Sequence, residues 1–296
     1  MSTTQTNCHY LCPNCRAPIE DDEQQIELTC ANGHVIRRRG GVLTLLAKDF
    51  EEYLDQFSVA FRAYRADRKD PSLPTSAYAE LPFGTAVQGN AEWRAQQTDL
   101  QLILARLPAQ PSLRILDVGA WNGWLSHQLA QRGHHVTAVA YFDDERDGLG
   151  ARQHYPNPTW QAIQMDEVDL DILCQSFDMV VLNRCVQFSP DPLAQVKKAQ
   201  RRVSPGGQLI ITGLGFYRDP SAQRSHLAAL QQRFQQNHGL PLFLRPARGY
   251  LDSHDLRQLE ALGLLIKPYA NPVIAIAKSI LRPTTPRACF AIWRNG

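Results

Sequence analysis

From residue 113 onward, short apolar runs alternate with amphipathic stretches, which predicts a mostly parallel β-sheet covered by helices on both faces. The runs are rich in Val, Ile and Leu and are too short for helices, so they are typical of buried strands. The expected strands are Arg114–Val118, His135–Val139, Thr159–Gln164, Met179–Leu182, Gln208–Thr212, Leu265–Pro268 and Ala288–Trp293. The last strand follows a short crossover and can insert antiparallel.

Helices are expected between these strands. Their ranges are Trp124–Arg132, Asp147–His154, Pro192–Arg202 and Ser253–Leu262. Gly133 ends the first helix, and Pro205-Gly-Gly207 provides the turn before the fifth strand. Asp252, Ser253 and His254 are expected to cap the last helix. The glutamine-rich run 231–236 predicts an amphipathic helix in the long segment between the fifth and sixth strands.

Upstream of the sheet, aromatic residues recur at helical spacing from Phe50 to Tyr64 and predict a helix that packs on the main domain. Asp49, with Glu52 three residues later, has the pattern of a capping box at the start of this helix. A second helix is expected at about residues 91–107. These patterns divide the chain into residues 1–47, a helical connector or cap over 48–107, and a main domain over 108–296.

Composition and charge narrow the function classes. The 296-residue chain is 44% hydrophobic and 20% charged, with a net charge of +2. This balance is typical of globular proteins and gives no general attraction to nucleic acid or membranes, although a local patch could still bind RNA. No run approaches the length of a membrane span, and residues 1–7 lack the apolar core of a secretion signal. We therefore expect a cytoplasmic protein whose seven cysteines are thiols or metal ligands, with Cys174 and Cys185 in the core.

Four of the seven cysteines lie within the first thirty residues. Two short knuckles, Cys12-Pro-Asn-Cys15 and Cys30-Ala-Asn-Gly-His34, supply three thiolates and one imidazole. This set suits a tetrahedral zinc ion, and four protein ligands close the coordination shell, so its role is structural. The predicted ligands are Cys12, Cys15, Cys30 and His34. Cys8 and His9 are competing ligands outside the knuckle geometry, and a cluster of free thiols is the alternative.

The knuckles and the following Arg39–Leu46 resemble the small zinc-ribbon module of Trm112-like proteins. They also resemble the zinc-binding front end of ribosomal RNA guanine-N1 methyltransferases. The resemblance covers about the first 46 residues and implies a surface for a protein partner or for RNA. Arg37, Arg38 and Arg39 could contact RNA phosphates, and the alternative is that they form a solvated edge of the ribbon.

The first strand of the main domain runs into Asp117-Val-Gly-Ala-Trp-Asn-Gly123 and then into a helix. Glycines allow the backbone to approach a ligand closely, and ligands of open α/β sheets bind beyond the carboxyl ends of the strands. This turn is therefore the expected site of a nucleotide-type cofactor. Together with Phe177–Asn183 and the Pro205-Gly-Gly207 turn, it resembles class I S-adenosylmethionine-dependent methyltransferases of the type 11 group, over about residues 90–296.

The resemblance implies a Rossmann-like, seven-stranded methyltransferase sheet and S-adenosylmethionine as the cofactor. It also implies that Asp117 receives the cofactor's ammonium group, that Asp166 meets the adenine amino group, and that Asn183 faces the reacting centre. The predicted cofactor-binding residues are Asp117, Gly119, Trp121, Gly123, Asp143, Asp144, Asp166 and Asn183.

Two positions depart from the family's pattern. Trp121 replaces the middle glycine of the turn, and Ala140 replaces the acid that usually binds the two ribose hydroxyls. Losing that bond costs about 1.5–3 kcal/mol, or roughly one to two decades in affinity. Asp143 or Asp144 would recover part of it if the loop folds back. A catalytically degenerate, methyltransferase-like scaffold is therefore an alternative to an active enzyme.

The acceptor side departs as well, because Gln187-Phe188 stands where relatives often carry a His-Tyr pair. Methyl transfer is an in-line displacement and needs a general base only when the acceptor must lose a proton. An already nucleophilic acceptor is then easier to serve than an unactivated hydroxyl. We predict a methyltransferase for a small-molecule or biosynthetic acceptor, lined by Asn183, Gln187 and Tyr217, with RNA as a further alternative.

Overall fold

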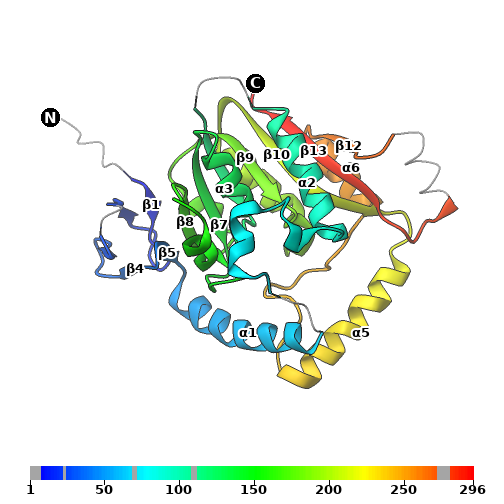
Figure 1. Cartoon of the computed structure of the whole chain (residues 1–296), viewed down its shortest axis with the longest axis horizontal. Helices are drawn as coiled ribbons and strands as arrows, with labels where there is room; N and C mark the ends of the chain where they lie inside the picture. The colour runs from blue at the N-terminus through cyan, green and yellow to red at the C-terminus, as the bar shows by residue number, and fades with distance from the viewer. Residues whose placement is uncertain (1–7, 23–24, 69–71, 108–111, 272–280) are drawn as a thin grey trace.

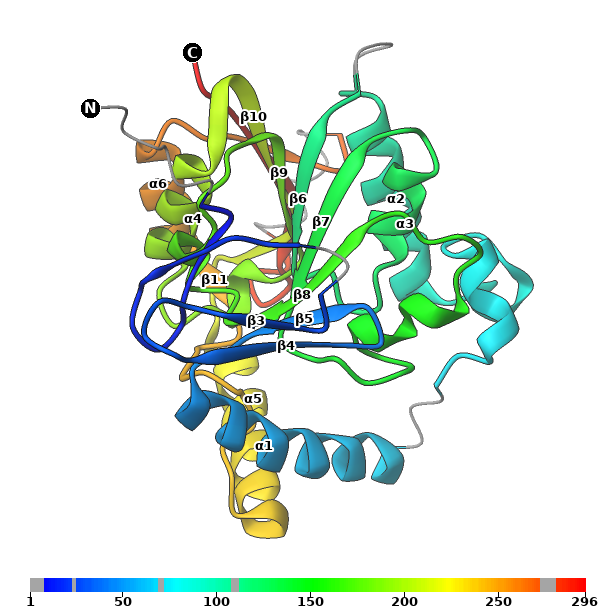
Figure 2. The ribbon, with the colours of Figure 1, turned by 90° about the vertical axis from the view of Figure 1, so that its left-hand side faces the viewer.

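A mixed β-sheet forms the centre of the molecule, with helices on both of its faces (Figures 1 and 2). The structure is a computed structural model that describes residues 8–22, 25–68, 72–107, 112–271 and 281–296. Its main strands are β6 (Arg114–Val118), β7 (His135–Ala140), β8 (Gln161–Met165), β9 (Phe177–Asn183), β10 (Val203–Tyr217), β12 (Leu265–Pro268) and β13 (Arg287–Arg294). A two-residue strand, β11 (Leu251–Asp252), pairs with β10.

The seven main strands lie in the order β8-β7-β6-β9-β10-β13-β12. The first five are parallel, and β13 runs antiparallel to both of its neighbours. All seven strands expected from the sequence are present, so the Rossmann-like sheet with a late antiparallel strand is confirmed. The chain order reverses between β6 and β9, and ligands of open α/β sheets bind at this kind of switch point.

Two layers of helices bury the two faces of the sheet. The helices α2 (Ala91–Leu104) and α3 (Trp124–Ala130) cover one face, and α4 (Pro192–Arg201) and α6 (Ser253–Ala261) cover the other (Figure 2). Successive strand residues enter opposite cores, as Ile115 and Leu116 do in β6. Asp252 caps α6 in a capping box with Asp255, which confirms the expected cap. The helix expected over Asp147–His154 is a 3₁₀ helix, η3 (Leu149–His154).

Two further helices, α1 (Lys48–Asp67) and α5 (Ser221–His238), pack together beyond the end of β7 (Figure 1). The expected capping box at Asp49 is wrong, because α1 begins after Ala47 and has no side-chain cap. Asn14 of the N-terminal module instead accepts a hydrogen bond from the N–H of Lys48 at 3.1 Å. Asp49 lies in the first turn, where a negative charge is favourable at a helix N-terminus.

Three short helices of the 3₁₀ type connect the larger elements on the way through the chain. η1 (Thr75–Glu80) and η2 (Thr85–Val87) lie between α1 and α2, and η5 (Val186–Phe188) follows β9. A further one, η4 (Leu170–Ile172), follows β8. Among the described helices, none is both long enough and apolar enough to cross a bilayer.

The N-terminal module is built into the main sheet. Its strands are β1 (Tyr10–Leu11), β2 (Pro18–Ile19), β3 (Glu27–Thr29), β4 (Val35–Arg39) and β5 (Val42–Leu45). β1 pairs with β2, whereas β3, β4 and β5 form an antiparallel run whose last strand pairs in parallel with β8. The sheet therefore crosses the boundary expected at residue 47, and the division into 1–47, 48–107 and 108–296 stays a prediction about domains.

A covalent bond also joins the module to the main domain. Cys8 and Cys174 form a disulfide, and the N–H of Cys174 donates to the carbonyl of His9 at 3.1 Å. The expectation that the cysteines are thiols or metal ligands is wrong for this pair, because sequence spacing carries no sign of a contact across 166 residues. Cys174 is half-buried rather than in the core, whereas Cys185 is buried as expected.

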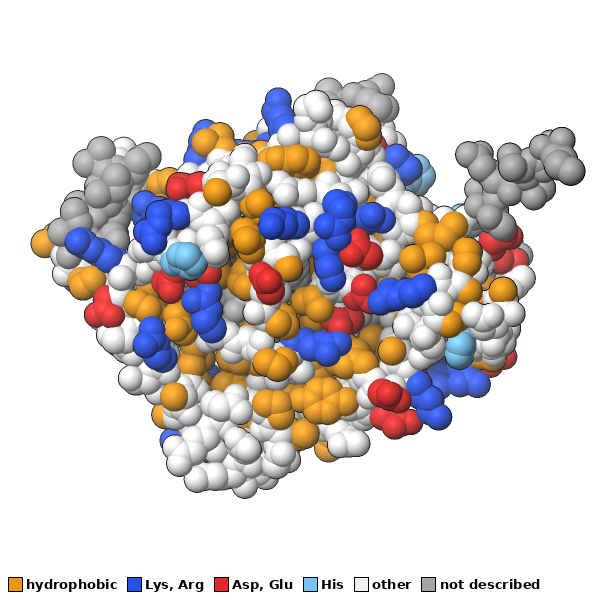
Figure 3. Space-filling view, turned by 180° about the vertical axis from the view of Figure 1, so that it is seen from behind, with side chains coloured by type: hydrophobic (Ala, Val, Ile, Leu, Met, Phe, Trp, Pro, Cys, Tyr) orange, Lys and Arg blue, Asp and Glu red, His pale blue; other side chains and the backbone are white. Residues whose placement is uncertain are grey.

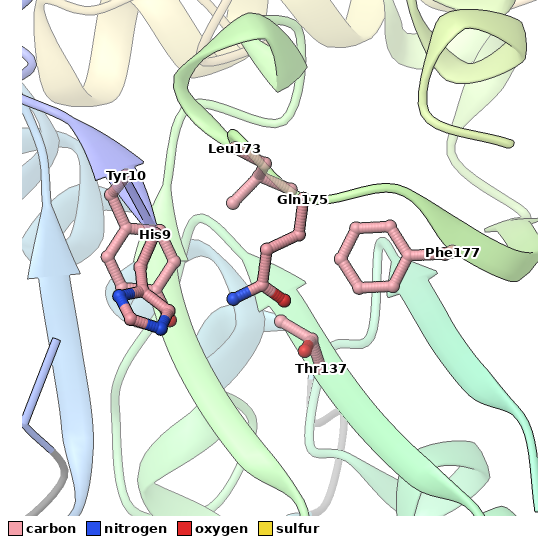
Figure 4. Close-up of a pocket in the computed structure, with 6 residues that line it drawn as sticks. All are labelled: His9, Tyr10, Thr137, Leu173, Gln175 and Phe177. Atoms are coloured by element: carbon pink, nitrogen blue, oxygen red, sulfur yellow. The ribbon is translucent and has the colours of Figure 1, made fainter. Parts of the chain in front are cut away.

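Figure 4 shows the seam beside this disulfide. His9 and Tyr10 face Leu173 and Gln175 across a narrow gap, which has no room for a water molecule. Tyr10 also forms a β-bridge with Leu173. The space is therefore a packing seam between the module and the sheet.

Candidate functional site

The four residues expected to bind zinc converge in the N-terminal module. One ligand atom from each of Cys12, Cys15, Cys30 and His34 lies within 4.8 Å of all the others. The Sγ atoms of Cys15 and Cys30 are 3.7 Å apart, and Nδ1 of His34 is 3.4 Å from Sγ of Cys30. A tetrahedron with Zn–S bonds of about 2.3 Å has sulfur–sulfur edges of about 3.8 Å. The donor set and its spacing therefore fit a zinc ion.

The backbone beside the first knuckle favours the thiolate of Cys15. A hydrogen bond from the backbone of Ala17 is the main cause that lowers the pKa of Cys15 to about 6, whereas burial raises the pKa of Cys12. Gly33 takes a φ of +80° in the second knuckle, a left-handed value that glycine adopts readily. A thiolate is the form that binds metal.

The two competing ligands are engaged elsewhere. Cys8 is in the disulfide, and Nδ1 of His9 accepts a hydrogen bond from the N–H of Asp21 at 3.1 Å.

The glycine turn between β6 and α3 is tightly packed against the protein itself. A Cβ on Gly119 would lie 2.8 Å from Cβ of Cys185 and 2.9 Å from the carbonyl oxygen of Asn183. A Cβ on Gly123 would collide with the ring of the buried Trp160. Both glycines have a φ near +77°. The close packing that they allow brings β6, β9 and α3 together around the turn.

Trp121 keeps the glycine-like backbone of this turn. Its φ is +52°, and left-handed conformations cost about 1–2 kcal/mol in a residue with a Cβ. The indole is half-buried and belongs to none of the three hydrophobic clusters of the described residues. The replacement therefore keeps the path of the turn at a cost in backbone strain.

Asp117 has one carboxylate oxygen without a partner. The side chain is fully buried, and Oδ2 accepts a hydrogen bond from the hydroxyl of Ser126 at 2.7 Å. Oδ1 is buried and has no hydrogen-bond partner among the described residues. Burial raises the pKa of Asp117 to about 7, while the neighbouring Ser126 and Asn183 oppose the rise. A buried acid of this kind suits a cationic ligand, which would stabilise its ionised form.

Glu167, which the sequence analysis missed, is a second buried acid at this end of the sheet. Burial raises its pKa to about 8, and the charges of Asp166 and Asp117 add to the rise. Its side chain therefore lies close to both acids, beyond the ends of β6 and β8. The only signal in the sequence was its position directly after Asp166, at the end of an expected strand.

Asp166 connects three segments of the chain. Its Oδ1 accepts a hydrogen bond from the hydroxyl of Tyr141 at 2.8 Å, and its Oδ2 forms an ion pair with Arg245. The guanidinium carbon of Arg245 lies 3.9 Å from the centre of the Phe50 ring in α1. Burial, first among several causes, raises the pKa of Tyr141 well above its usual value. The carboxylate predicted to bind adenine thus contacts Tyr141 and Arg245, and Arg245 in turn lies over the ring of Phe50.

The two aspartates of the loop after β7, Asp143 and Asp144, interact with other parts of the structure. Ala140 is buried at the end of β7. Oδ1 of Asp144 accepts hydrogen bonds from the N–H groups of Arg146 and Asp147, so it caps its own loop. The pKa of Asp143 is raised, chiefly by burial, and the charge of Asp55 in α1 adds to the rise whereas that of Arg39 in β4 opposes it. A ribose role for Asp143 and Asp144 stays a prediction.

The three predicted acceptor residues lie at different distances from the turn. Asn183 is buried beside Asp117, and its Oδ1 accepts from the hydroxyl of Thr212 at 3.3 Å. Gln187 donates to the carbonyl of Arg184 at 2.8 Å. Tyr217 lies five residues beyond Thr212 in β10, or about 15 Å along the strand, and packs against Tyr250. Asn183 and Gln187 are therefore near the turn, and Tyr217 is not.

The chain is similar to known proteins chiefly over this part of the sheet. Residues 116–211 match the family model described as a methyltransferase domain. A ubiquinone biosynthesis O-methyltransferase of Xanthomonas campestris is 28% identical over 183 residues, which cover 58% of this chain and 74% of the relative. The protein of the same name from Coxiella burnetii is 27% identical over 165 residues, which cover 53% and 69%.

Two solved structures also resemble the chain. An O-methyltransferase family protein from Burkholderia thailandensis has a TM-score of 0.47 and 13% identity, and the match covers 83% of this chain and 72% of the other. A putative methyltransferase from Bacillus halodurans has a TM-score of 0.45 and 14% identity, with 67% and 99% covered.

Proposed function

Because this chain carries a class I S-adenosylmethionine-dependent methyltransferase domain and is a methyltransferase for a small molecule, we propose that it methylates an oxygen atom of a hydroxylated aromatic intermediate in biosynthesis. The observation that carries the cofactor site is the unpartnered, buried oxygen of Asp117, with Glu167 beside it. The relatives are O-methyltransferases of ubiquinone biosynthesis by name, which supports an oxygen on a ring as the acceptor.

The residues at the ends of β6 and β8 fit the cofactor. When bound, S-adenosylmethionine supplies a methyl group on a positively charged sulfur. Oδ1 of Asp117 is free to accept a hydrogen bond from the ammonium group, and Glu167 adds negative charge in the same buried place. Asp166 is the acceptor for the adenine amino group, and Gly119 and Gly123 hold the turn in shape. These residues bind and orient the ammonium group and the positively charged sulfur of the cofactor in a poorly solvated site.

Aromatic side chains cover the neighbouring space and support a ring-bearing acceptor. A cluster of them lies between α1, α5 and the loop after β7, and many of its members are only partly buried. The partly buried aromatic members are Phe50, Tyr53, Phe61, Tyr64, Tyr141, Phe142 and Phe243. Figure 3 shows hydrophobic side chains gathered across the lower middle of the molecule. Such faces favour flat, apolar ligands.

The acceptor side contributes alignment more than proton transfer. Gln187 and Phe188 supply no group that takes up a proton near neutral pH. A phenolic hydroxyl has a pKa of about 10, far below that of an alcohol, so it becomes nucleophilic with little help. Asn183 and Gln187 are proposed to orient this hydroxyl for in-line displacement.

We further propose that Cys12, Cys15, Cys30 and His34 hold a structural zinc ion that shapes the N-terminal module. A protein partner on this module is compatible with the exposed side chains of Ile26 and Val35. RNA is less favoured, because Arg38 is paired with the buried Asp21 at 2.6 Å and Arg37 with Glu27 at 3.0 Å.

Calorimetry and a transfer assay on the full chain test the proposed function. We expect S-adenosylmethionine and its demethylated product to bind at micromolar concentration, and radiolabelled methyl groups to appear on catechol-type acceptors. Asp117→Asn should abolish both, whereas Asp171→Asn, which changes an exposed acid paired with Arg201, should preserve both. Absence of cofactor binding at millimolar concentration would instead support the scaffold alternative.

A further inference from the structure

Arg184, directly after β9, is held in a costly backbone conformation. Its φ is +56°, in the left-handed region that residues with a Cβ adopt at a cost of about 1–3 kcal/mol. Its side chain lies over Gly213, where the pairing of β10 with β13 shifts register. A Cβ at position 213 would collide with Cγ of Arg184, and Gly213 itself has a φ of +66°. Two adjacent strands therefore deform to place one arginine.

Asp99 of α2 forms an ion pair with this arginine. Asp99 is fully buried, and its Oδ2 lies 2.6 Å from Nε of Arg184. Its Oδ1 accepts a hydrogen bond from the hydroxyl of Tyr269, and that hydroxyl accepts one from the N–H of Gly213 at 3.1 Å. Both oxygens of Asp99 are thus occupied, and only one of them is bonded to the arginine.

The bond to Asp99 leaves the two terminal nitrogens of the Arg184 guanidinium group available. A structural arginine–carboxylate pair is often bidentate and uses two N–H groups, whereas here the hydrogen bond is made by Nε alone. Arg184 pairs with no other acid among the described residues, and 30% of its side-chain surface is exposed. Its terminal nitrogens are therefore fixed in position and still able to bind an anion in the bidentate manner.

Three acids and the Arg184–Asp99 pair lie around the switch point of the sheet. Asp117 near the end of β6 lies close to Asp166 and Glu167, which follow β8, and the cationic cofactor is proposed to bind there. Arg184 is a cation on the neighbouring strand, next to Asn183, which lies beside Asp117. We propose that Arg184 forms an anion subsite that binds a carboxylate group of the methyl acceptor. This inference rests on the proposed function and narrows its acceptor to a hydroxylated aromatic acid.

Equilibrium binding of two matched ligands tests the subsite without turnover. Protocatechuate and catechol share a ring with two hydroxyls and differ by one carboxylate. We expect the wild-type full chain, with S-adenosylhomocysteine bound, to prefer protocatechuate. Arg184→Gln should weaken protocatechuate binding by about 10-fold to 100-fold, as expected for a lost charge-assisted hydrogen bond, and should leave catechol binding unchanged. Arg184→Lys should recover part of the preference, because it restores the charge without the fork.

Two controls separate this inference from others. Arg201→Gln removes an exposed arginine of α4 that pairs with Asp171, and should change neither ligand's affinity. Binding of S-adenosylhomocysteine and the unfolding temperature of each variant report whether the fold and the cofactor site are intact. A wild-type protein that does not prefer the acid, or an Arg184→Gln variant that keeps the preference, would overturn the subsite. Failure of the cofactor to bind to wild type would instead overturn the proposed function.

Discussion

Arg245 forms an ion pair with Asp166, although the two residues are 79 positions apart in the sequence. The pair ties the segment between α5 and β11 to the end of β8. Because Asp166 is the predicted acceptor for the cofactor's adenine, the same carboxylate serves an internal cation in the structure described here. We therefore predict that the arginine competes with the cofactor for that carboxylate.

Removing this competition should strengthen cofactor binding. We predict that Arg245→Gln lowers the Kd for S-adenosylmethionine by about 3-fold to 10-fold, because the ion pair no longer has to be given up. The free energy of unfolding should fall by about 1–2 kcal/mol, since a part-buried charged hydrogen bond and a cation–π contact are lost. Calorimetry and urea unfolding measure the two effects. Weaker cofactor binding in this variant would contradict the competition.

Zinc should bind in one equivalent per chain and stabilise the fold. We predict that His34→Gln loses the metal and at least about 2 kcal/mol of unfolding free energy, because structural zinc contributes directly to folding. His9→Gln is the matched control, since His9 lies outside the cluster and accepts a hydrogen bond from the backbone of Asp21. Metal analysis by mass spectrometry and thermal unfolding distinguish the variants. Retention of zinc by His34→Gln would rule out the proposed ligand set.

The buried acids should make stability fall as pH rises. Burial raises the pKa of Glu167 from 4.5 to about 8, so between these values the folded state binds more protons than the unfolded state. The free energy of unfolding of the cofactor-free protein should therefore decrease across this window and level off above it.

Glu167→Gln should remove much of this slope and stabilise the protein at pH 8 by on the order of 4 kcal/mol, since the pKa is raised from 4.5 to about 8 and each pKa unit corresponds to about 1.4 kcal/mol. Urea unfolding at several pH values measures it, with the exposed Glu260→Gln as control. A wild-type stability that rises steadily from pH 5 to about pH 8 would contradict the raised pKa.

Trp121→Gly should relieve strain in the turn. We predict a gain of about 0.5–1 kcal/mol in unfolding free energy, because glycine adopts a positive φ readily, partly offset by its greater freedom in the unfolded chain. Trp121→Ala removes the same ring but keeps a Cβ, so it should show no such gain. Comparing the two variants by urea unfolding isolates the backbone effect, and equal stabilities would exclude it.

The strands of the main domain could be predicted from the sequence because each is a short apolar run with polar flanks. The bounds of β6 and β12 agree with the expected ones. β10 is longer than expected, from Val203 to Tyr217, because register shifts near Gly207 and Gly213 let the strand continue through its glycines. Such shifts depend on the neighbouring strands, which local periodicity does not describe.

The residues of the candidate site also divide into those that the sequence predicts and those that it does not. The zinc ligands and Asp117 stand in short motifs whose spacing indicates their chemistry. Arg245 and Glu167 carry no such spacing, since their roles come from the folding of distant segments onto the ends of β6 and β8. The pairing of β5 with β8 and the Cys8–Cys174 disulfide likewise join positions more than a hundred residues apart.

The pairing of β5 with β8 has a practical consequence for preparing this protein. Without the first five strands, β8 would become an exposed edge strand of the sheet, and its unpaired backbone groups could pair with other molecules. Because the zinc ion that we propose shapes these strands, we expect expression without added metal to give more insoluble protein, while the soluble fraction keeps its normal rate of methyl transfer.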